Sequence, residues 1–360
     1  MWPNRRFMDL VGVDLPIIQA PMAGANGAAM AIAAAEAGGL GSLPCAMLSA
    51  DKIRAEAGVI RQQTDKPINL NFFCHTPEPS DPARDAAWKE ALAGYYDEYG
   101  IDPDAPLAAA SRAPFSAETC DIVEDLKPEI VSFHFGLPAP VLLDRVKATG
   151  CRIMSSATTV AEASWLEERG CDLIIAQGAE AGGHRGMFLA KDIATQAGTM
   201  ALVPQIVDAV DVPVIAAGGI GDGRGIAAAF ALGAAAAQIG TAYLFTPQSI
   251  ISDLHRAALR TARDDQTALT NLFSGKPARG LMNRVMEEVG PMSDKAPPFP
   301  LAGSALAPLK AKAEAEGAAE FSSLWSGQAA KLGREIEAGE LTRQLMADAA
   351  QCLRALSGSE

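Results

Sequence analysis

The sequence predicts an α/β fold, namely a (β/α)8 TIM barrel followed by a smaller, mostly helical C-terminal domain. The first observation is that short apolar stretches bounded by Gly and Pro recur eight times, and the second is that an alanine-rich stretch with helical spacing follows each. The third is size, because the eight units fill roughly the 250 residues that such a barrel needs. A doubly wound sheet more usually closes at five or six strands.

Eight strands are expected, and most of them read as continuous apolar runs, as strands buried on both faces should. Their ranges are 16–21, 40–45, 68–73, 130–136, 152–157, 172–178, 213–219 and 236–244. Three of the intervening helices start with recognisable N-caps, which are Ser49, Thr158 or Thr159, and Asp222.

Two segments exceed the minimal barrel pattern. Residues 75–127, after the third strand, contain two expected helices and form an enlarged loop on the catalytic face. Toward the C-terminus, charged and Pro-containing sequence precedes helical sequence at 305–317 and again from 328 onward. We therefore expect two domains, a barrel at 1–260 and a helical cap or substrate domain at 261–360 that ends in a helix.

Composition excludes several classes of protein. The net charge of −13 argues against a nucleic-acid partner, because phosphodiester chains are bound by clustered Lys and Arg. The six cysteines form no C-x-x-C pair, so no metal site is expected and the thiols read as reduced and cytoplasmic. Asp9 and Asp14 interrupt any signal-like N-terminus. The longest apolar run, 225–237, is too short to span a bilayer, so no membrane partner is expected.

Glycines concentrate at the expected carboxyl ends of the last two strands, where barrel enzymes place their sites. GGIGDGRG occupies 218–225 and QIGT occupies 238–241. A phosphate group needs backbone N–H donors and a close approach of the main chain, which glycine permits. The string is not a dinucleotide-binding G-x-G-x-x-G fingerprint. A bound phosphate is therefore expected here, with a tight turn that needs positive φ as the alternative.

The loop QGAEAGGHRG at 177–186 ends the expected sixth strand and carries His184, one of four histidines. Histidine exchanges a proton near neutral pH, so His184 is a candidate acid or base, with a surface histidine as the alternative. His134 fits either the barrel mouth or a satisfied core position. His75 is a further pocket candidate, and His255 is expected on a helix facing solvent.

The sequence contains no paired carboxylates and no H-E-x-x-H, G-x-S-x-G or Walker motif. Metal-dependent hydrolases, serine hydrolases and nucleoside-triphosphate-binding enzymes are therefore not expected. One histidine beside a phosphate pocket suggests a phosphorylated cofactor that supplies the difficult chemistry, and FMN is the economical choice. Asn71 and Gln177 are candidates to hydrogen-bond the flavin ring edge. Each fits equally well as a core residue that satisfies backbone groups.

Seven colinear segments resemble the nitronate monooxygenase family, formerly called 2-nitropropane dioxygenases, over nearly the whole chain. They are PIIQAPMAG (16–24), EAGGLGS (36–42), AQGAEAGGHRG (176–186), PVIAAGGIGDGRG (213–225), QIGTAYL (238–244), SGKPARG (274–280) and LWSGQ (324–328). The resemblance implies an FMN-dependent (β/α)8 protein. The proline in APMAG departs from the glycine of several relatives and bears on the pocket beside Met22.

The resemblance also implies roles, position by position. The FMN-binding set would be Ala20, Pro21 and Met22 near the isoalloxazine, with Asn71, Gln177, Gly182, Gly218, Gly219, Gln238, Ile239, Gly240 and Thr241. His184 would be the catalytic base or the charge partner of the substrate. The walls of the substrate pocket would come from Met22, Phe73, His134 and Trp325, each with ordinary core packing as the alternative.

The implied reaction converts an alkyl nitronate, or a nitroalkane deprotonated by His184, with dioxygen to a carbonyl compound and nitrite. FMN-dependent NAD(P)H reductases of the same fold, namely enoyl-acyl-carrier-protein reductases and NADH:quinone reductases, share the EAGGH segment and are the main alternative. SGKPARG and LWSGQ favour the monooxygenase branch. A non-catalytic flavin-binding protein would not need His184. The sequence names no physiological substrate, and a homodimer is a further expectation.

Overall fold

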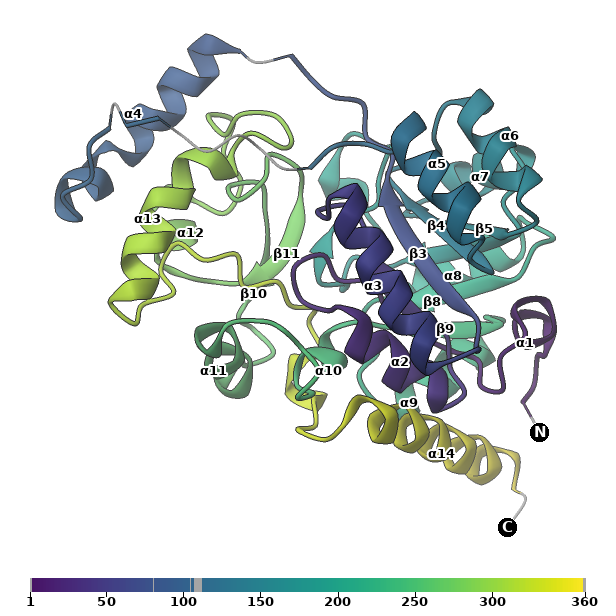
Figure 1. Cartoon of the computed structure of the whole chain (residues 1–360). Coiled ribbons are helices and arrows are strands. Elements are labelled where there is room, and N and C mark those ends of the chain that lie inside the picture. The colour runs from purple at the N-terminus through teal and green to yellow at the C-terminus, as the bar shows by residue number, and fades with distance from the viewer. Residues whose placement is uncertain (1, 80, 104, 107–111, 359–360) are drawn as a thin grey trace.

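Eight parallel strands close into a barrel in the computed structural model, which describes residues 2–79, 81–103, 105–106 and 112–358. The strands follow the order β1-β9-β8-β6-β5-β4-β3-β2. A parallel bridge between Ile18 and Leu40 joins the two ends of this sheet, and the Leu40 amide donates to the Ile17 carbonyl at 2.9 Å. The predicted (β/α)8 barrel is therefore confirmed (Figure 1).

Each barrel strand lies within its predicted range. The strands are β1 (Ile17–Gln19), β2 (Gly41–Pro44), β3 (Ile68–Phe73), β4 (Ile130–His134), β5 (Arg152–Ala157), β6 (Leu173–Gln177), β8 (Val214–Ala217) and β9 (Ala236–Ile239). The prediction for the last strand is wrong beyond Ile239, because the chain turns at Gly240 into the one-turn helix α10 (Thr241–Leu244). The apolar residues of α10 follow those of β9 closely, so the sequence pattern does not distinguish the helix from a continued strand.

Helices lie around the barrel and at its two ends, and three of them begin at the predicted caps. They are α1 (Arg6–Val11), α2 (Ala28–Glu36), α3 (Ala50–Gln63), α5 (Ala117–Leu126), α6 (Pro140–Ala148), α7 (Val160–Glu168), α8 (Thr199–Val207), α9 (Gly223–Ala231), α11 (Asp253–Thr261) and α14 (Ala338–Ser357), with short 3-10 turns η1 (Ile193–Thr195) and η2 (Ala330–Leu332). Ser49, Thr159 and Asp222 each accept a backbone N–H of the helix that follows. Over the described ranges, no helix is long and apolar enough to cross a membrane.

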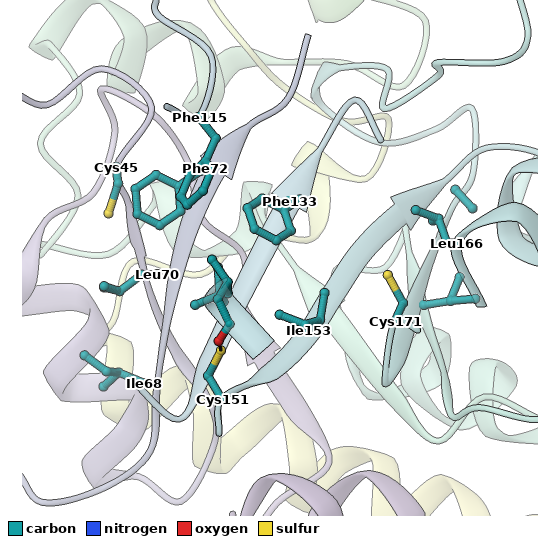
Figure 2. Packing of buried hydrophobic residues seen from close by; sticks show 14 of the residues in the cluster. Cys45, Ile68, Leu70, Phe72, Phe115, Phe133, Cys151, Ile153, Leu166 and Cys171 are labelled. Atoms are coloured by element: carbon teal, nitrogen blue, oxygen red, sulfur yellow. Dashed lines mark hydrogen bonds between the residues drawn. The ribbon is translucent and has the colours of Figure 1, made fainter. Parts of the chain in front are cut away.

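Strand residues alternate between the helix layer outside and the barrel interior. Outward residues of β3, such as Ile68 and Phe72, pack with Phe133 and Phe115 against the helices, and the Phe72 and Phe115 rings lie 5.0 Å apart (Figure 2). Most inward residues near the amino ends of the strands are apolar and pack with Phe7 of α1, with Ser42 and Asn69 as polar exceptions. The last inward residues are more polar, which leaves the carboxyl end of the barrel suited to bind a ligand.

A second lobe adjoins the carboxyl ends of the strands. We define it as α4 (Pro82–Glu98), α12 (Arg284–Val289), α13 (Gly303–Ala315) and an antiparallel sheet of β10 (Thr267–Thr270), β11 (Ala278–Leu281) and β7 (Gly183–His184). Helix α4, from the enlarged segment 75–127, lies against α13 (Figure 1), and its Trp88 Nε1 donates to the Ala302 carbonyl at 3.0 Å. Residues 80, 104 and 107–111 of that segment lie outside the described residues.

The C-terminal hundred residues differ in part from the expected helical domain. They include the strands β10 and β11 as well as helices, and the helix predicted from 328 onward begins only at Ala338. That helix, α14, packs on α2 and α9 of the barrel rather than on the second lobe. The division of the chain into domains at residue 260 stays a prediction.

Candidate functional site

A cavity of about 530 Å³ lies at the carboxyl ends of the barrel strands, the end where barrel enzymes hold their active sites. The further candidate His75 is not among its lining residues and packs against the Phe299 ring at 4.7 Å, whereas all but one of the other predicted site residues line the cavity. These are Ala20, Pro21, Met22, Asn71, Phe73, His134, Gln177, Gly182, His184, Gly218, Gly219, Gln238, Gly240, Thr241 and Trp325. The exception is Ile239, whose side chain is buried among the outer helices while its carbonyl accepts the Ala20 N–H at 2.9 Å.

Glycine-rich backbone forms one side of this cavity. Gly218 and Gly219 adopt φ of 111° and 69°, a region that favours glycine. A Cβ atom on Gly182 would lie 2.5 Å from the backbone nitrogen of Gly327, so two distant loops touch there. The Gly327 N–H donates to Thr241 Oγ1 at 2.9 Å. The loop after β9 and the LWSGQ segment are thereby held together.

The helix N-termini beside these loops differ in how they are capped. Asp222 occupies the N-terminus of α9, where its carboxylate accepts the N–H groups of Arg224 and Gly225. Gly240 precedes α10 and supplies no side-chain cap. The start of the one-turn helix α10 therefore has no side-chain acceptor, whereas two of the first N–H groups of α9 are already bonded to Asp222.

His184 lies on β7, which pairs in antiparallel fashion with β11, so that His184 is opposite Ala278. Its Nε2 atom lies 2.8 Å from Ser274 Oγ. The rings of Phe299 and Trp325 have their centres 5.5 Å from the imidazole. His184 is thus a cavity-lining residue enclosed by aromatic rings rather than a surface histidine.

Burial is the largest cause that holds the pKa of His184 well below its usual 6.5, followed by the positive charge of Arg112. His134 and Lys276 lower that pKa further. Arg112 stands 5.8 Å from the Phe299 ring, and Lys276 Nζ stands 5.1 Å from the Phe135 ring. His184 is therefore neutral at pH 7 and can accept a proton, and the two cations favour a negative charge beside it.

The loop that carries His184 is held by buried polar side chains. Gln177 Nε2 donates to the His184 carbonyl at 3.0 Å, and its Oε1 accepts the Gly186 N–H at 2.8 Å. The fully buried guanidinium of Arg185 donates to the Gln177 carbonyl at 2.7 Å and also to Gly178. Desolvation lowers the pKa of Arg185 to about 10. Both polar atoms of the Gln177 side-chain amide are therefore bonded to the backbone of this loop.

His134 lies at the barrel mouth and is also hydrogen-bonded like a core residue, so both alternatives from the sequence apply to it. It lines the cavity, yet its Nδ1 lies 2.5 Å from Ser156 Oγ and its Nε2 lies 3.2 Å from the His184 carbonyl. Desolvation lowers its pKa to about 4, so this ring is neutral. Asn71 Nδ2 donates to Ser132 Oγ at 2.9 Å, which fixes its amide at the cavity wall.

Sequence reasoning missed or misplaced several residues at the site. His255 was expected to face solvent, and that is wrong, because it is 7% exposed and its Nε2 lies 3.0 Å from the Trp325 carbonyl. Ser274, Lys276 and Arg112 were not singled out. The first two lie in the SGKPARG segment, whose resemblance was the one available signal. The sequence around Arg112 has no recognisable pattern.

Fold and cavity together define a class of protein, a (β/α)8 barrel with a deep glycine-lined cavity and a neutral histidine at its wall. The model of the nitronate monooxygenase family matches residues 4–348. The chain therefore belongs to the nitronate monooxygenase family, whose members are flavin-dependent oxidoreductases.

Individual relatives agree with this assignment. A nitronate monooxygenase from Pseudomonas aeruginosa is 42% identical over 95% of this chain and 98% of its own. One from Paraburkholderia phytofirmans is 42% identical over 98% of this chain and 97% of its own. The solved structure of a nitroalkane oxidase from Streptomyces ansochromogenes superimposes with a TM-score of 0.88 at 36% identity, covering 98% of this chain and 99% of that one. These relatives favour the monooxygenase branch over the reductase alternative.

Proposed function

We propose that this protein is an FMN-dependent enzyme that oxidises alkyl nitronates, and the nitroalkanes from which they form, to carbonyl compounds and nitrite. The observation that carries the proposal is a neutral His184 in the wall of the cavity that the positive-φ glycine loops also line. The names of the relatives at 42% identity support the same substrate class.

The residues present fit FMN. Gln238 Oε1 is buried in the cavity wall and, within the described ranges, has no hydrogen-bond partner, as expected of a group that awaits a ligand donor. Gly219, Gly240 and Thr241 would receive the phosphate, because the first two bring bare backbone to the cavity. Asn71 would face the ring system. Gln177 would act through the loop that it holds, since its amide is already bonded.

FMN, when bound, would accept electrons from the substrate. The chain's own residues would prepare that substrate: neutral His184 accepts the proton from the carbon beside the nitro group, and the positive charges of Arg112 and Lys276 favour the anion that results. Phe73 and Trp325 give apolar walls that exclude water from the anion.

The first experiment tests the cofactor. The purified protein should show a flavin visible spectrum, and heat-released cofactor should run with FMN rather than with FAD or riboflavin on chromatography. A colourless protein that does not take up added FMN would contradict the proposal.

The second experiment tests the base. His184→Asn should keep FMN and lose about 100-fold or more of its turnover on a neutral nitroalkane, because proton abstraction by a positioned base contributes at least that factor. Turnover of a preformed nitronate, which needs no deprotonation, should fall much less. Unchanged kinetics on the neutral nitroalkane would remove His184 from the mechanism.

The reductase alternative is tested by anaerobic mixing with NADH or NADPH. Flavin reduction by a nitronate, with no bleaching by either pyridine nucleotide, supports the proposed function. Rapid bleaching by a pyridine nucleotide would favour the reductase instead.

A further inference from the structure

We infer that Ser274 is a positioning residue that holds neutral His184 as its Nε2–H tautomer, so that Nδ1 is the atom that accepts the substrate proton. The inference rests on the proposed role of His184 and assigns the atom and the partner through which it acts. Ser274 is fully buried, and its Oγ lies 2.8 Å from His184 Nε2. No other side chain in the described part of the molecule makes a hydrogen bond to the His184 ring.

The contacts of the Ser274 hydroxyl determine which way its proton points. Its Oγ lies 3.3 Å from the Lys276 carbonyl oxygen and 3.4 Å from the Lys276 backbone nitrogen. The carbonyl can only accept and the backbone N–H can only donate, while a hydroxyl has one proton and two lone pairs. When the proton goes to the carbonyl, both lone pairs are free for the Lys276 N–H and for an N–H on His184 Nε2, and all three contacts are satisfied.

The opposite arrangement satisfies fewer groups. If the hydroxyl donated to a lone pair on Nε2, the part-buried Lys276 carbonyl would lose this donor, so one of the three contacts would be left unmade. The imidazolium form, which would donate from both nitrogens, is disfavoured by burial and by Arg112 and Lys276. The Nε2–H tautomer is therefore the one that the surroundings select.

The backbone of His184 is fixed, and the Phe299 and Trp325 rings enclose its imidazole, which holds the ring against Ser274. Its carbonyl accepts from Gln177 Nε2 at 3.0 Å and lies 3.2 Å from His134 Nε2. The β7–β11 pairing holds the same residue from the other side. With Nε2 occupied by Ser274, the remaining nitrogen of this cavity-lining ring is Nδ1.

The proton transfer balances with these groups alone. The C–H bond beside the nitro group breaks, its electron pair moves into the nitro group to give the nitronate, and the proton forms an N–H bond at His184 Nδ1. The imidazolium that forms keeps its Nε2–H bond to Ser274 Oγ, which accepts it without moving its own proton. Ser274 therefore stabilises the base both before and after the transfer.

The tautomer can be measured directly by two-bond proton–nitrogen spectra of the FMN-loaded, nitrogen-15-labelled protein. The chain has only four histidines, so the signals of His184 are assigned as those lost in His184→Asn. The wild type should show the Nε2–H tautomer at His184, and Ser274→Ala should show a mixture or the Nδ1–H form. An Nδ1–H tautomer in the wild type, or an unchanged ring in Ser274→Ala, would overturn the inference.

Kinetics give a second readout. Ser274→Ala should lower turnover of a neutral nitroalkane by about 10- to 100-fold more than turnover of a preformed nitronate, because only the first substrate needs the base. Ser274→Thr, which keeps the hydroxyl, should restore turnover of the neutral nitroalkane. An equal loss on both substrates would leave Ser274 as a merely structural residue and contradict the inference. If His184→Asn itself has no effect, the proposed function fails, while the spectra still decide the pairing of Ser274 with His184.

Discussion

At the scale of single residues, the loop that carries His184 depends on one buried carboxylate outside the cavity. Glu162 is fully buried, and its Oε1 accepts the backbone N–H groups of Phe188, Leu189 and Ala190 at 2.7, 2.9 and 3.2 Å. Its Oε2 accepts from the N–H and the hydroxyl of Thr158, both at 2.7 Å. A carboxylate is the group that can accept from five donors without offering a proton in return.

We predict that Glu162→Gln destabilises the protein by about 2–3 kcal/mol, because the amide puts an N–H₂ group against backbone donors. Urea unfolding measures the change. Glu168→Gln on the same helix is the control, since that side chain is 71% exposed and should change the free energy of unfolding by less than about 0.5 kcal/mol. Equal effects of the two substitutions would refute the role given to Glu162.

Sequence reasoning at this scale found residues that stand in a pattern and missed those that do not. His184 was found because glycines flank it at a strand end. Ser274 was not found, because it lies 90 positions from His184 in the chain. Nothing in the residues beside Ser274 indicates that the two side chains are in contact. His255 was misplaced because one turn of helix pattern does not reveal that another chain segment covers it.

At the scale of elements, the barrel strands were predictable because most of them are apolar runs bounded by Gly or Pro residues. The same rule overextended the last strand, since the apolar residues of α10 look no different from those of β9. The short strands β10 and β11 were missed because they are polar in part and pair over only four residues. Helix starts were predictable where a side chain caps them.

Two glycines in regular elements provide a prediction about packing. Gly58 lies within α3, and a Cβ atom there would meet nothing within 4 Å, so Gly58→Ala should stabilise the protein by about 0.5–1 kcal/mol through helix propensity. Gly41 lies in β2, where a Cβ would collide with the backbone of Ala31 in α2. Gly41→Ala should therefore destabilise. Thermal melting measures both, and a lower melting temperature for Gly58→Ala would contradict the first prediction.

At the scale of the whole molecule, the chain enters the second lobe three times, at α4, at β7 and from β10 to α13, and then returns to the barrel. Helix α4 leaves from the third strand, the segment from β10 to α13 follows the last strand, and α14 comes back to cover α2 and α9 (Figure 1). This order could not be predicted from sequence, because the amphipathic pattern of a helix shows that one face is buried but not which other element covers that face.

The returning helix gives a test of this arrangement. Leu345 of α14 is fully buried in the cluster that includes Met30 of α2 and Phe230 of α9. Leu345→Ala should cost about 2–5 kcal/mol of unfolding free energy and lower the cooperative transition of the barrel itself. Leu356→Ala on the same helix is the control, because Leu356 is 79% exposed. A separate early transition in Leu345→Ala, with the main one unchanged, would show that α14 is not part of the barrel's cooperative unit.

Acid should destabilise the whole molecule through its buried histidines. Burial lowers the pKa of His75, His134 and His255 from 6.5 to about 4. Between pH 6.5 and 4 these histidines bind protons in the unfolded chain but not in the folded chain. Their contribution to the free energy of unfolding is therefore fully present above pH 6.5 and is lost as the pH drops toward 4. Melting temperatures of the apoprotein at pH 7.5, 6.5 and 5.5 should decline in order.

The matched variant for this pH dependence is His255→Asn, whose decline between pH 6.5 and 5.5 should be shallower than that of the wild type. Carboxylates with lowered pKa values, such as Glu56, titrate below this window and do not contribute to it. A melting temperature that stays constant from pH 7.5 to 5.5 would contradict the prediction.

The pairing of β7 with β11 has a consequence for exchanging parts between relatives. The histidine at the barrel wall takes its strand partner, its hydroxyl neighbour and the nearby lysine from a stretch that begins about 90 residues later. A chimera that joins one relative's barrel to another's second lobe at residue 260 would therefore divide this group between two parents. Transplanting residues 274–281 together with 183–184 would keep these contacting residues from one parent. The segments that must be exchanged together at this site are therefore far apart in the sequence.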